Sequence, residues 1–194
     1  MPRLAHFAAF ASALLLASCD SGTPWHMTNI TGVMPALEFS MTRASDGRAV
    51  SADDYRGKVV VLYFGYTHCP DICPTTLANL SDALERLGKR ANGVRILFVT
   101  VDPRRDSLPV LRRYVSAFAP QLDGLRGSDN ALARLARRYR VIYSVTPVSS
   151  GRAYEVAHSD SVFFFDRGGH ARLVTTDTRN TPALADDLRR LLAE

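Results

Sequence analysis

Cysteine is scarce in this sequence, with three residues in 194, at positions 19, 69 and 73. So few cysteines exclude a disulfide-rich scaffold of the kind that small secreted proteins use. The chain also lacks low-complexity tracts and internal repeats, which excludes solenoids and repeat arrays. Its composition, with 46% hydrophobic and 22% charged residues, is typical of a globular protein. Its length of 194 residues is enough for one domain of ordinary size and an N-terminal extension.

A strong excess of charge of one sign is also missing. The formal net charge is +5, and the arginines are scattered along the chain. A solvated basic surface accounts for this modest positive charge, and the charge distribution does not indicate a nucleic-acid partner.

The first 19 residues, MPRLAHFAAFASALLLASC, combine one basic residue with a short apolar run over 7–17. This segment is too short to span a bilayer comfortably and is typical of an export signal. Its ending resembles the bacterial lipoprotein signal, in which Cys19 becomes the lipidated first residue. A plain secretory signal and an uncleaved anchor are the alternatives.

We therefore expect a lipoprotein signal peptide over 1–18, a lipidated tether over 19–34 and a folded domain over 35–194. The lipid would hold the protein at the extracytoplasmic (periplasmic) side of the bacterial inner membrane. That compartment is oxidising, so the remaining cysteine pair is a disulfide, a redox couple or a metal site.

Hydrophobic periodicity predicts strands that alternate with helices. The order matches a thioredoxin-like α/β fold, with a central mixed sheet flanked by helices and an N-terminal β-hairpin. Thr181 is expected to cap the last helix. The expected elements are a hairpin over 36–51, a strand over 58–64, a helix over 74–88, a strand over 94–101, helices around 108–118 and from Ser128, a hairpin over 161–175 and a helix from 181.

Cys69 and Cys73 lie four positions apart in GYTHCPDICPTT, directly after the apolar run KVVVLYF. Pro74 suits the first helical position, so we expect Cys73 near the helix cap, with its thiol pKa lowered by the helix dipole. Two side chains four apart on a helical turn face the same way, so both sulfurs can reach one ion. Thiolates are soft ligands that select Cu(I), and an added imidazole also suits Cu(II).

Whether a third ligand exists is open at this point, and the histidines are its candidates. His26 lies in the expected tether, His170 lies beside a hairpin turn, and the side chain of His68 can point away from its neighbour Cys69. His158 precedes the apolar run 162–165, and a thioredoxin-like fold brings that loop next to the start of the first helix. His158 is therefore a candidate ligand, and an ordinary loop or core histidine is the alternative.

The run FGYTHCPDICPTT over 64–76 resembles the signature of the Sco/SenC family. The stretch VDPRRD over 101–106 is similar to the second block of that family, and His158-Ser159 to its third. The resemblance covers about residues 30–192. It implies a membrane-tethered, thioredoxin-like protein that binds one copper ion through Cys69, Cys73 and His158.

The resemblance also implies a role in assembling the CuA centre of cytochrome c oxidase. A copper metallochaperone would deliver the ion to the oxidase subunit that carries CuA. A thiol–disulfide reductase, with Cys69 and Cys73 as its redox pair, would instead keep the cysteines of that subunit reduced. Another copper chaperone or a thiol reductant is a further expected partner. Peroxide reduction is a weaker third interpretation, because neither cysteine lies in the usual peroxidase sequence.

One position departs from the family pattern. An acid usually precedes the histidine, and here Ala157 does, which puts the handling of a partner in question more than ligation. Asp71, inside the cysteine motif, either tunes the metal as a nearby negative charge, docks a partner or faces the helix dipole. Asp102-Pro103 is expected to shape the loop beside the site.

Overall fold

The computed structural model describes residues 23–147 and 154–194. The signal peptide expected over 1–18 and the lipidation expected at Cys19 lie outside the described residues. Within the described part of the chain, no helix is both long and apolar enough to cross a membrane.

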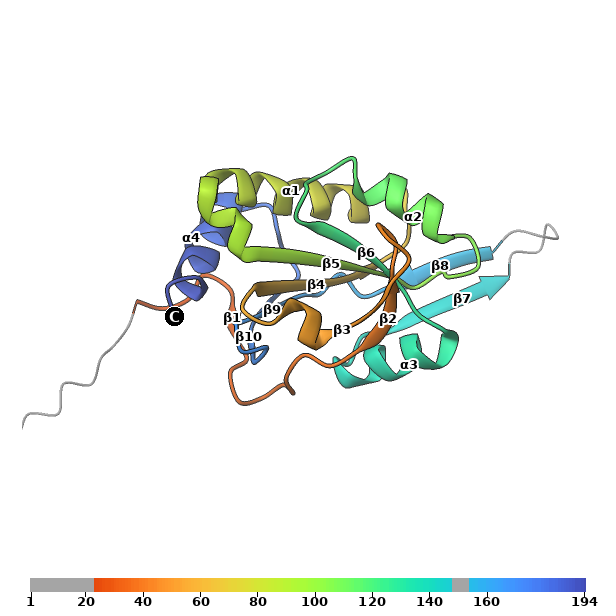
Figure 1. Ribbon diagram of the computed structural model, residues 1–194, viewed down its shortest axis with the longest axis horizontal. Helices are drawn as coiled ribbons and strands as arrows, with labels where there is room; N and C mark the ends of the chain where they lie inside the picture. Colours follow the sequence, from red (N-terminus) through yellow and green to blue (C-terminus); the bar gives the residue numbers. More distant parts are fainter. Residues whose placement is uncertain (1–22, 148–153) are drawn as a thin grey trace, which may run out of the picture.

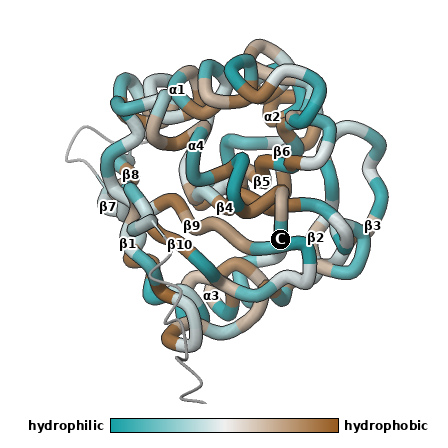
Figure 2. The backbone as a smooth tube through the Cα atoms, turned by 90° about the vertical axis from the view of Figure 1, so that its left-hand side faces the viewer, coloured by the Kyte–Doolittle hydropathy of each residue, from teal (hydrophilic) through white to brown (hydrophobic). Residues whose placement is uncertain are grey.

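An eight-stranded mixed sheet forms the centre of the molecule, in the order β1-β10-β9-β4-β5-β6-β2-β3 (Figure 1). The parallel strands β4 (Val59–Gly65), β5 (Val94–Thr100) and β6 (Leu122–Arg126) lie together, and β9 (Val162–Phe165) runs antiparallel on the other side of β4. Every residue of β4 is buried, because helices and loops cover both faces of the sheet. Figure 2 shows this apolar centre between polar outer layers. The expected fold class, a thioredoxin-like α/β fold, is confirmed.

The helices form two layers around the sheet (Figures 1 and 2). One face carries α1 (Ile72–Leu87), α2 (Leu108–Val115) and α4 (Thr181–Leu191), and the other carries α3 (Asp129–Arg138). Leucines recur at helical spacing along α1 and form a buried inward face, which anchors the helix that begins at the cysteine motif. Its buried leucines are Leu77, Leu80, Leu84 and Leu87.

Both expected hairpins are present. The first pairs β2 (Ser40–Arg43) with β3 (Ala49–Ser51) through a turn in which Gly47 has a φ of 73°, a conformation that favours glycine. The second pairs β9 with β10 (Ala171–Thr175), with a register shift between Ala171 and Leu173. Two short 3-10 helices, η1 (Ala52–Tyr55) and η2 (Gly88–Gly93), complete the connections.

Several elements differ from the prediction. Strand β6 was missed because its sequence LDGLR mixes charge and glycine with two leucines. The hairpin of β7 (Tyr143–Pro147) and β8 (Tyr154–His158) was missed because β7 is mostly exposed and lacks an apolar pattern. Asn180, and not Thr181, caps α4, since its side-chain oxygen accepts the N–H of Ala183.

The described part of the expected tether is packed on the domain. Strand β1 (Thr28–Asn29) pairs with β10 at the edge of the sheet, and Met27 is buried. The backbone N–H groups of His26 and Met27 donate to the carboxylate of Asp187, which is 0% exposed. The folded part of the chain therefore starts before the boundary expected at residue 35.

Asp187→Ala tests this attachment. Removing the carboxylate leaves the buried N–H of Met27 without its acceptor, so we expect a loss of about 1–3 kcal/mol in the free energy of unfolding. Asp186→Ala is the matched control, because the carboxylate of Asp186 is exposed. This substitution should change the free energy of unfolding by less than about 0.5 kcal/mol. Urea unfolding of both variants measures the difference, and equal stabilities would contradict the anchoring role.

Candidate metal centre

The site lies at the carboxyl end of β4, where the chain leaves the sheet and enters α1. Gly65 ends the strand, and a Cβ atom at this position would lie 2.5 Å from the ring of Phe98 and 2.8 Å from Cys73 Sγ. Any larger residue would therefore displace the Cys73 sulfur. The glycine makes room for a thiol that sits directly against the end of the central strand.

The two cysteines converge in a different way from the one predicted. Helix α1 begins at Ile72 with Asp71 as its N-cap, so Pro74 is the third helical residue and Cys69 precedes the helix. Cys69 lies in a turn, and its Sγ accepts the backbone N–H of Cys73 at 3.5 Å. Cys69 therefore approaches Cys73 from the segment before the helix, and not through helical spacing.

Cys73 is completely buried, whereas Cys69 is 9% exposed. The hydroxyl of Tyr63 donates to Cys73 Sγ at 3.6 Å. Burial raises the pKa of the Cys73 thiol to about 12, which reverses the expected lowering by the helix dipole. Removal from water raises the pKa by more than the hydrogen bonds from nearby N–H and O–H groups lower it. Both cysteines are free thiols.

His158 reaches the cysteines because of strand register. Strand β9 pairs antiparallel with β4, and Val162 lies opposite Tyr63. The chain before Val162 therefore runs alongside the residues that follow Tyr63, which places His158 beside the cysteine loop. In β8, residues 154, 156 and 158 face inward and residues 155 and 157 are exposed.

Two contacts set the state of the His158 ring. Nδ1 lies 2.8 Å from the carbonyl oxygen of Ser159, which can only accept, so Nδ1 carries the proton. Burial lowers the pKa of the imidazole, so the ring is neutral near pH 7. The lone pair of Nε2 then faces Cys73 Sγ at 3.2 Å. A neutral imidazole whose other nitrogen is held by a carbonyl is the usual form of a metal-binding histidine.

Cys69, Cys73 and His158 each offer one ligand atom, and these atoms all lie within 4.8 Å of one another. Bonds of about 2.0–2.3 Å would place the donors of a three-coordinate ion roughly 3.5–4 Å apart. The group therefore fits a soft metal ion with small shifts of the side chains. The structure brings together all three residues that the sequence singled out as ligands.

The structure shows that Ala157 leaves the orientation of the His158 ring unaffected. Its side chain is on the exposed face of β8, opposite to His158, and the carbonyl of Ser159 already orients the imidazole. An acid at position 157 would point to solvent, so its absence leaves the ring support intact. Asp71 is exposed, and its carboxylate contacts the hydroxyl of Thr75 at 3.5 Å.

A buried carboxylate that the sequence did not single out holds the cysteine loop. Asp106 is 0% exposed and accepts from the backbone N–H of Thr67 at 3.0 Å, from the Thr67 hydroxyl at 2.6 Å and from the Thr100 hydroxyl at 2.6 Å. It joins the cysteine loop to the end of β5. Its position four residues after Asp102 was the available signal, since both acids follow a buried strand.

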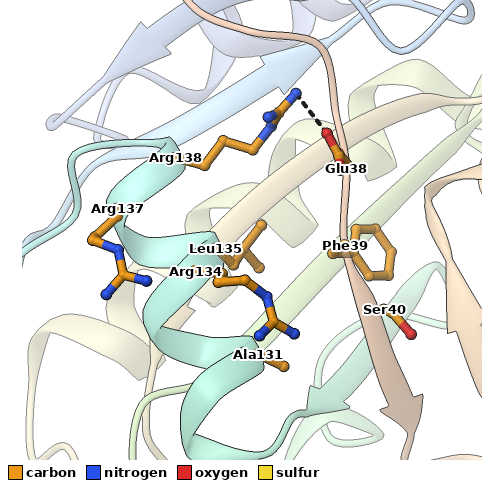
Figure 3. Close-up of a pocket in the computed structure, with 8 residues that line it drawn as sticks. All are labelled: Glu38, Phe39, Ser40, Ala131, Arg134, Leu135, Arg137 and Arg138. Atoms are coloured by element: carbon orange, nitrogen blue, oxygen red, sulfur yellow. Dashed lines mark ion pairs between the residues drawn. The ribbon is translucent and has the colours of Figure 1, made fainter.

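The other histidines that the structure describes do not join this group. His26, His68 and His170 are exposed, and His170 interacts with Asp166. An open groove between α3 and residues 38–40 is lined by Arg134, Arg137 and Arg138, with Arg138 paired to Glu38 at 3.0 Å (Figure 3). This groove contains no cysteine or histidine and is separate from the metal-ligating group.

A thioredoxin-like protein with a Cys-x-x-x-Cys and histidine group is thus defined by fold and site. Comparison with known proteins gives the family. The chain matches the SCO1/SenC family model over residues 33–193, and it belongs to this family. The bovine "Protein SCO2 homolog, mitochondrial" is 39% identical over 149 residues, which cover 76% of this chain and 56% of that protein. The chain therefore spans little more than half of the length of this relative.

Solved structures agree with this assignment. The structure of Bradyrhizobium japonicum ScoI with copper bound has a TM-score of 0.73 at 35% identity and covers 81% of this chain and 99% of that one. Yeast Sco1 with copper bound gives 0.73 at 31% identity, over 81% and 87% of the two chains. Both neighbours were solved with copper, and this chain has a group that can hold a metal ion.

The unequal burial of the two thiols can be tested on the reduced, metal-free protein. With iodoacetamide at about pH 8, we expect Cys69 to be alkylated well before Cys73, because Cys73 is buried and its pKa is raised. The Cys73 rate should rise about tenfold per pH unit below its pKa. Mass spectrometry of the peptides measures both rates. Protein unfolded in urea is the control, in which the rates should be nearly equal, and equal rates in the folded protein would contradict the burial.

Proposed function

We propose that this protein is a copper metallochaperone that binds one copper ion through Cys69, Cys73 and His158. The observation that carries the proposal is the distance of 3.2 Å between His158 Nε2 and Cys73 Sγ, with all three ligand atoms within 4.8 Å of one another. Two thiolates suit Cu(I), and the neutral imidazole extends the set to Cu(II). The copper-bound neighbours support the choice of metal.

Copper is the cargo of this site. The ion takes the place of the protons on the two thiols, and the lone pair of His158 Nε2 completes the set. Three ligands leave the ion open to attack by ligands of an acceptor, so transfer can proceed by stepwise exchange of sulfur ligands without covalent chemistry. The partly exposed Cys69 is the ligand that an acceptor would reach first.

The acceptor that we propose is the cytochrome c oxidase subunit that carries CuA, and the role is assistance in assembling that centre. The family membership and the resemblance of the cysteine motif support this assignment. We further propose that the chain is lipid-anchored through Cys19 on the extracytoplasmic side of the inner membrane, as the Leu-Ala-Ser-Cys ending indicates. Exposed Asp71 would then lie on the surface that meets the acceptor.

Thiol–disulfide reduction is a second candidate, favoured by the unequal exposure of the two sulfurs. The thiolate of Cys69 would attack a disulfide of the substrate protein, form a mixed disulfide and release one substrate thiolate. Cys73 would then attack the Cys69 sulfur, which forms the Cys69–Cys73 disulfide and releases the second thiolate. Two electrons pass to the substrate, and an external dithiol must return them. Copper binding and this reaction exclude each other at any instant.

His158→Ala distinguishes the two candidates. Loss of a direct ligand should weaken Cu(II) binding by more than about 100-fold, because even residues that only support a ligand change metal affinity by about 10–100-fold. Reduction of a model disulfide should change little. His170→Ala is the control, because its ring is exposed and outside the site. Competition titrations with a Cu(II) chelator measure the affinity, and an unchanged value in His158→Ala would refute the three-ligand site.

The cysteines are tested by their metal content. Copper added to the reduced protein should give one ion per chain and a thiolate-to-Cu(II) charge-transfer band. Serine at Cys69 or Cys73 should abolish that band and the reductase activity together, since serine offers no soft ligand and no redox sulfur. Copper loading of the double-serine variant at the wild-type level would overturn the site.

A further inference from the structure

The strand that carries His158 is not part of the central sheet. In the part of the chain that the structure describes, strands β7 and β8 pair with each other alone, as a separate two-stranded sheet. An isolated two-stranded hairpin is at best marginally stable in water, so its position depends on what fastens it. At its base, the N–H of Ser159 donates to the Ile142 carbonyl at 2.9 Å, and the N–H of Ile142 donates to the Ser159 hydroxyl at 3.0 Å.

A second fastening lies at the start of β8. The hydroxyl of Tyr154 donates to one carboxylate oxygen of Asp102 at 2.7 Å, and Nε of Arg105 donates to the other oxygen. Asp102 is 2% exposed and follows β5, so this contact joins the hairpin to the central sheet. The guanidinium carbon of Arg105 lies 4.1 Å from the centre of the Tyr154 ring. We call Asp102, Arg105 and Tyr154 the hairpin latch.

The latch also contacts the cysteine loop. The guanidinium of Arg105 lies 5.7 Å from the ring centre of Tyr66, and Tyr66 meets the His158 ring edge-on at 5.8 Å and 88°. Nη2 of Arg105 is buried without a hydrogen-bond partner among the described residues. The guanidinium is therefore held by Asp102 and by two aromatic rings, an arrangement that needs its flat, delocalised charge.

Strand geometry connects the latch to the ligand. Side chains 154, 156 and 158 share one face of β8, and Val156 is buried in the core. With the ring of Tyr154 bound to Asp102 and Val156 packed below the strand, rotation of β8 about its axis is blocked. His158 is then held toward Cys73, although the described backbone of β8 pairs with β7 and not with the central sheet.

We propose that the hairpin latch positions His158 for metal binding, with Asp102, Arg105 and Tyr154 as positioning residues that do not touch the ion. The metal-binding part of this inference rests on the proposed function. The placement of the His158 ring in the metal-free protein does not, and it can be measured separately.

Tyr154→Phe is the test, because it removes one hydroxyl and keeps the ring under Arg105. In the metal-free protein, we expect backbone amides of β8 to exchange with solvent about tenfold faster or more, since a hydrogen bond to a charged group is lost. Amides of β4 and β5 should keep wild-type rates, which shows that the variant folds. The NMR signals of the His158 ring should shift or broaden. Tyr143→Phe is the matched control on the same hairpin, because the Tyr143 hydroxyl bonds to no residue that the structure describes, and it should leave the exchange rates of the β8 amides unchanged.

Copper binding provides the second measurement. We expect Tyr154→Phe to weaken Cu(II) binding by about tenfold or more and to shift the charge-transfer band, with copper still bound by the two sulfurs. Arg105→Lys keeps the charge but loses the planar contact with both rings, so it should show the same direction of change.

The outcomes separate the two proposals. Wild-type hydrogen exchange and wild-type His158 ring signals in Tyr154→Phe would overturn the latch, whatever copper does. Altered ring signals with unchanged Cu(II) affinity would overturn its role in metal binding. If the wild-type protein fails to bind copper, the proposed function fails, and the metal-free measurements still decide whether the latch positions His158.

Discussion

The pairing of β9 with β4 is the constraint on which the site depends. Both strands are buried along their whole length, and Val162 is held opposite Tyr63 by the ladder. A slip of one residue would exchange the side chains that pack on the two buried faces of the sheet, and Val162 and the three phenylalanines would then fill the wrong spaces. The residues before β9 are thereby brought to the end of β4, where the cysteine loop begins. A thiol and an imidazole 85 positions apart in the chain become neighbours for this reason.

Burial gives the site its chemical character. The thiol of Cys73 has a raised pKa and the imidazole of His158 a lowered one, and both shifts come from removal of the group from water. Without metal, each of these two groups is therefore neutral near pH 7 and adds no charge to the core. A soft cation bound here would take the place of the thiol protons and accept the lone pair of the ring. The two sulfurs differ in exposure, because Cys73 is completely buried and Cys69 is 9% exposed.

Support for the site comes from outside the ligands. Asp106 ties the cysteine loop to β5, and Asp102, four residues earlier, receives the hydroxyl of Tyr154 from the hairpin. The loop after β5 thus holds both halves of the site, one carboxylate for each. Asp102-Pro103 was expected to shape a loop beside the site, and Asp102 accepts hydrogen bonds there from the Tyr154 hydroxyl and from the backbone N–H of Arg105. An alanine at position 157 does not weaken the support of the imidazole, because the carbonyl of Ser159 orients the ring.

The sequence by itself determined the fold class, the main helices and the candidate ligands. Local patterns carry that information: the apolar run of β4, the helical spacing of leucines in α1, and the glycine turns of the hairpins. The tertiary structure alone decided the remaining features, which include β6, the exposed hairpin of β7 and β8, the start of α1 at Ile72 and the packing of residues 23–34 on the domain. These depend on partners distant in the chain. The direction of the Cys73 pKa shift is the clearest case, because the helix start is a local feature that favours the thiolate, whereas burial is a property of the whole fold and outweighs it.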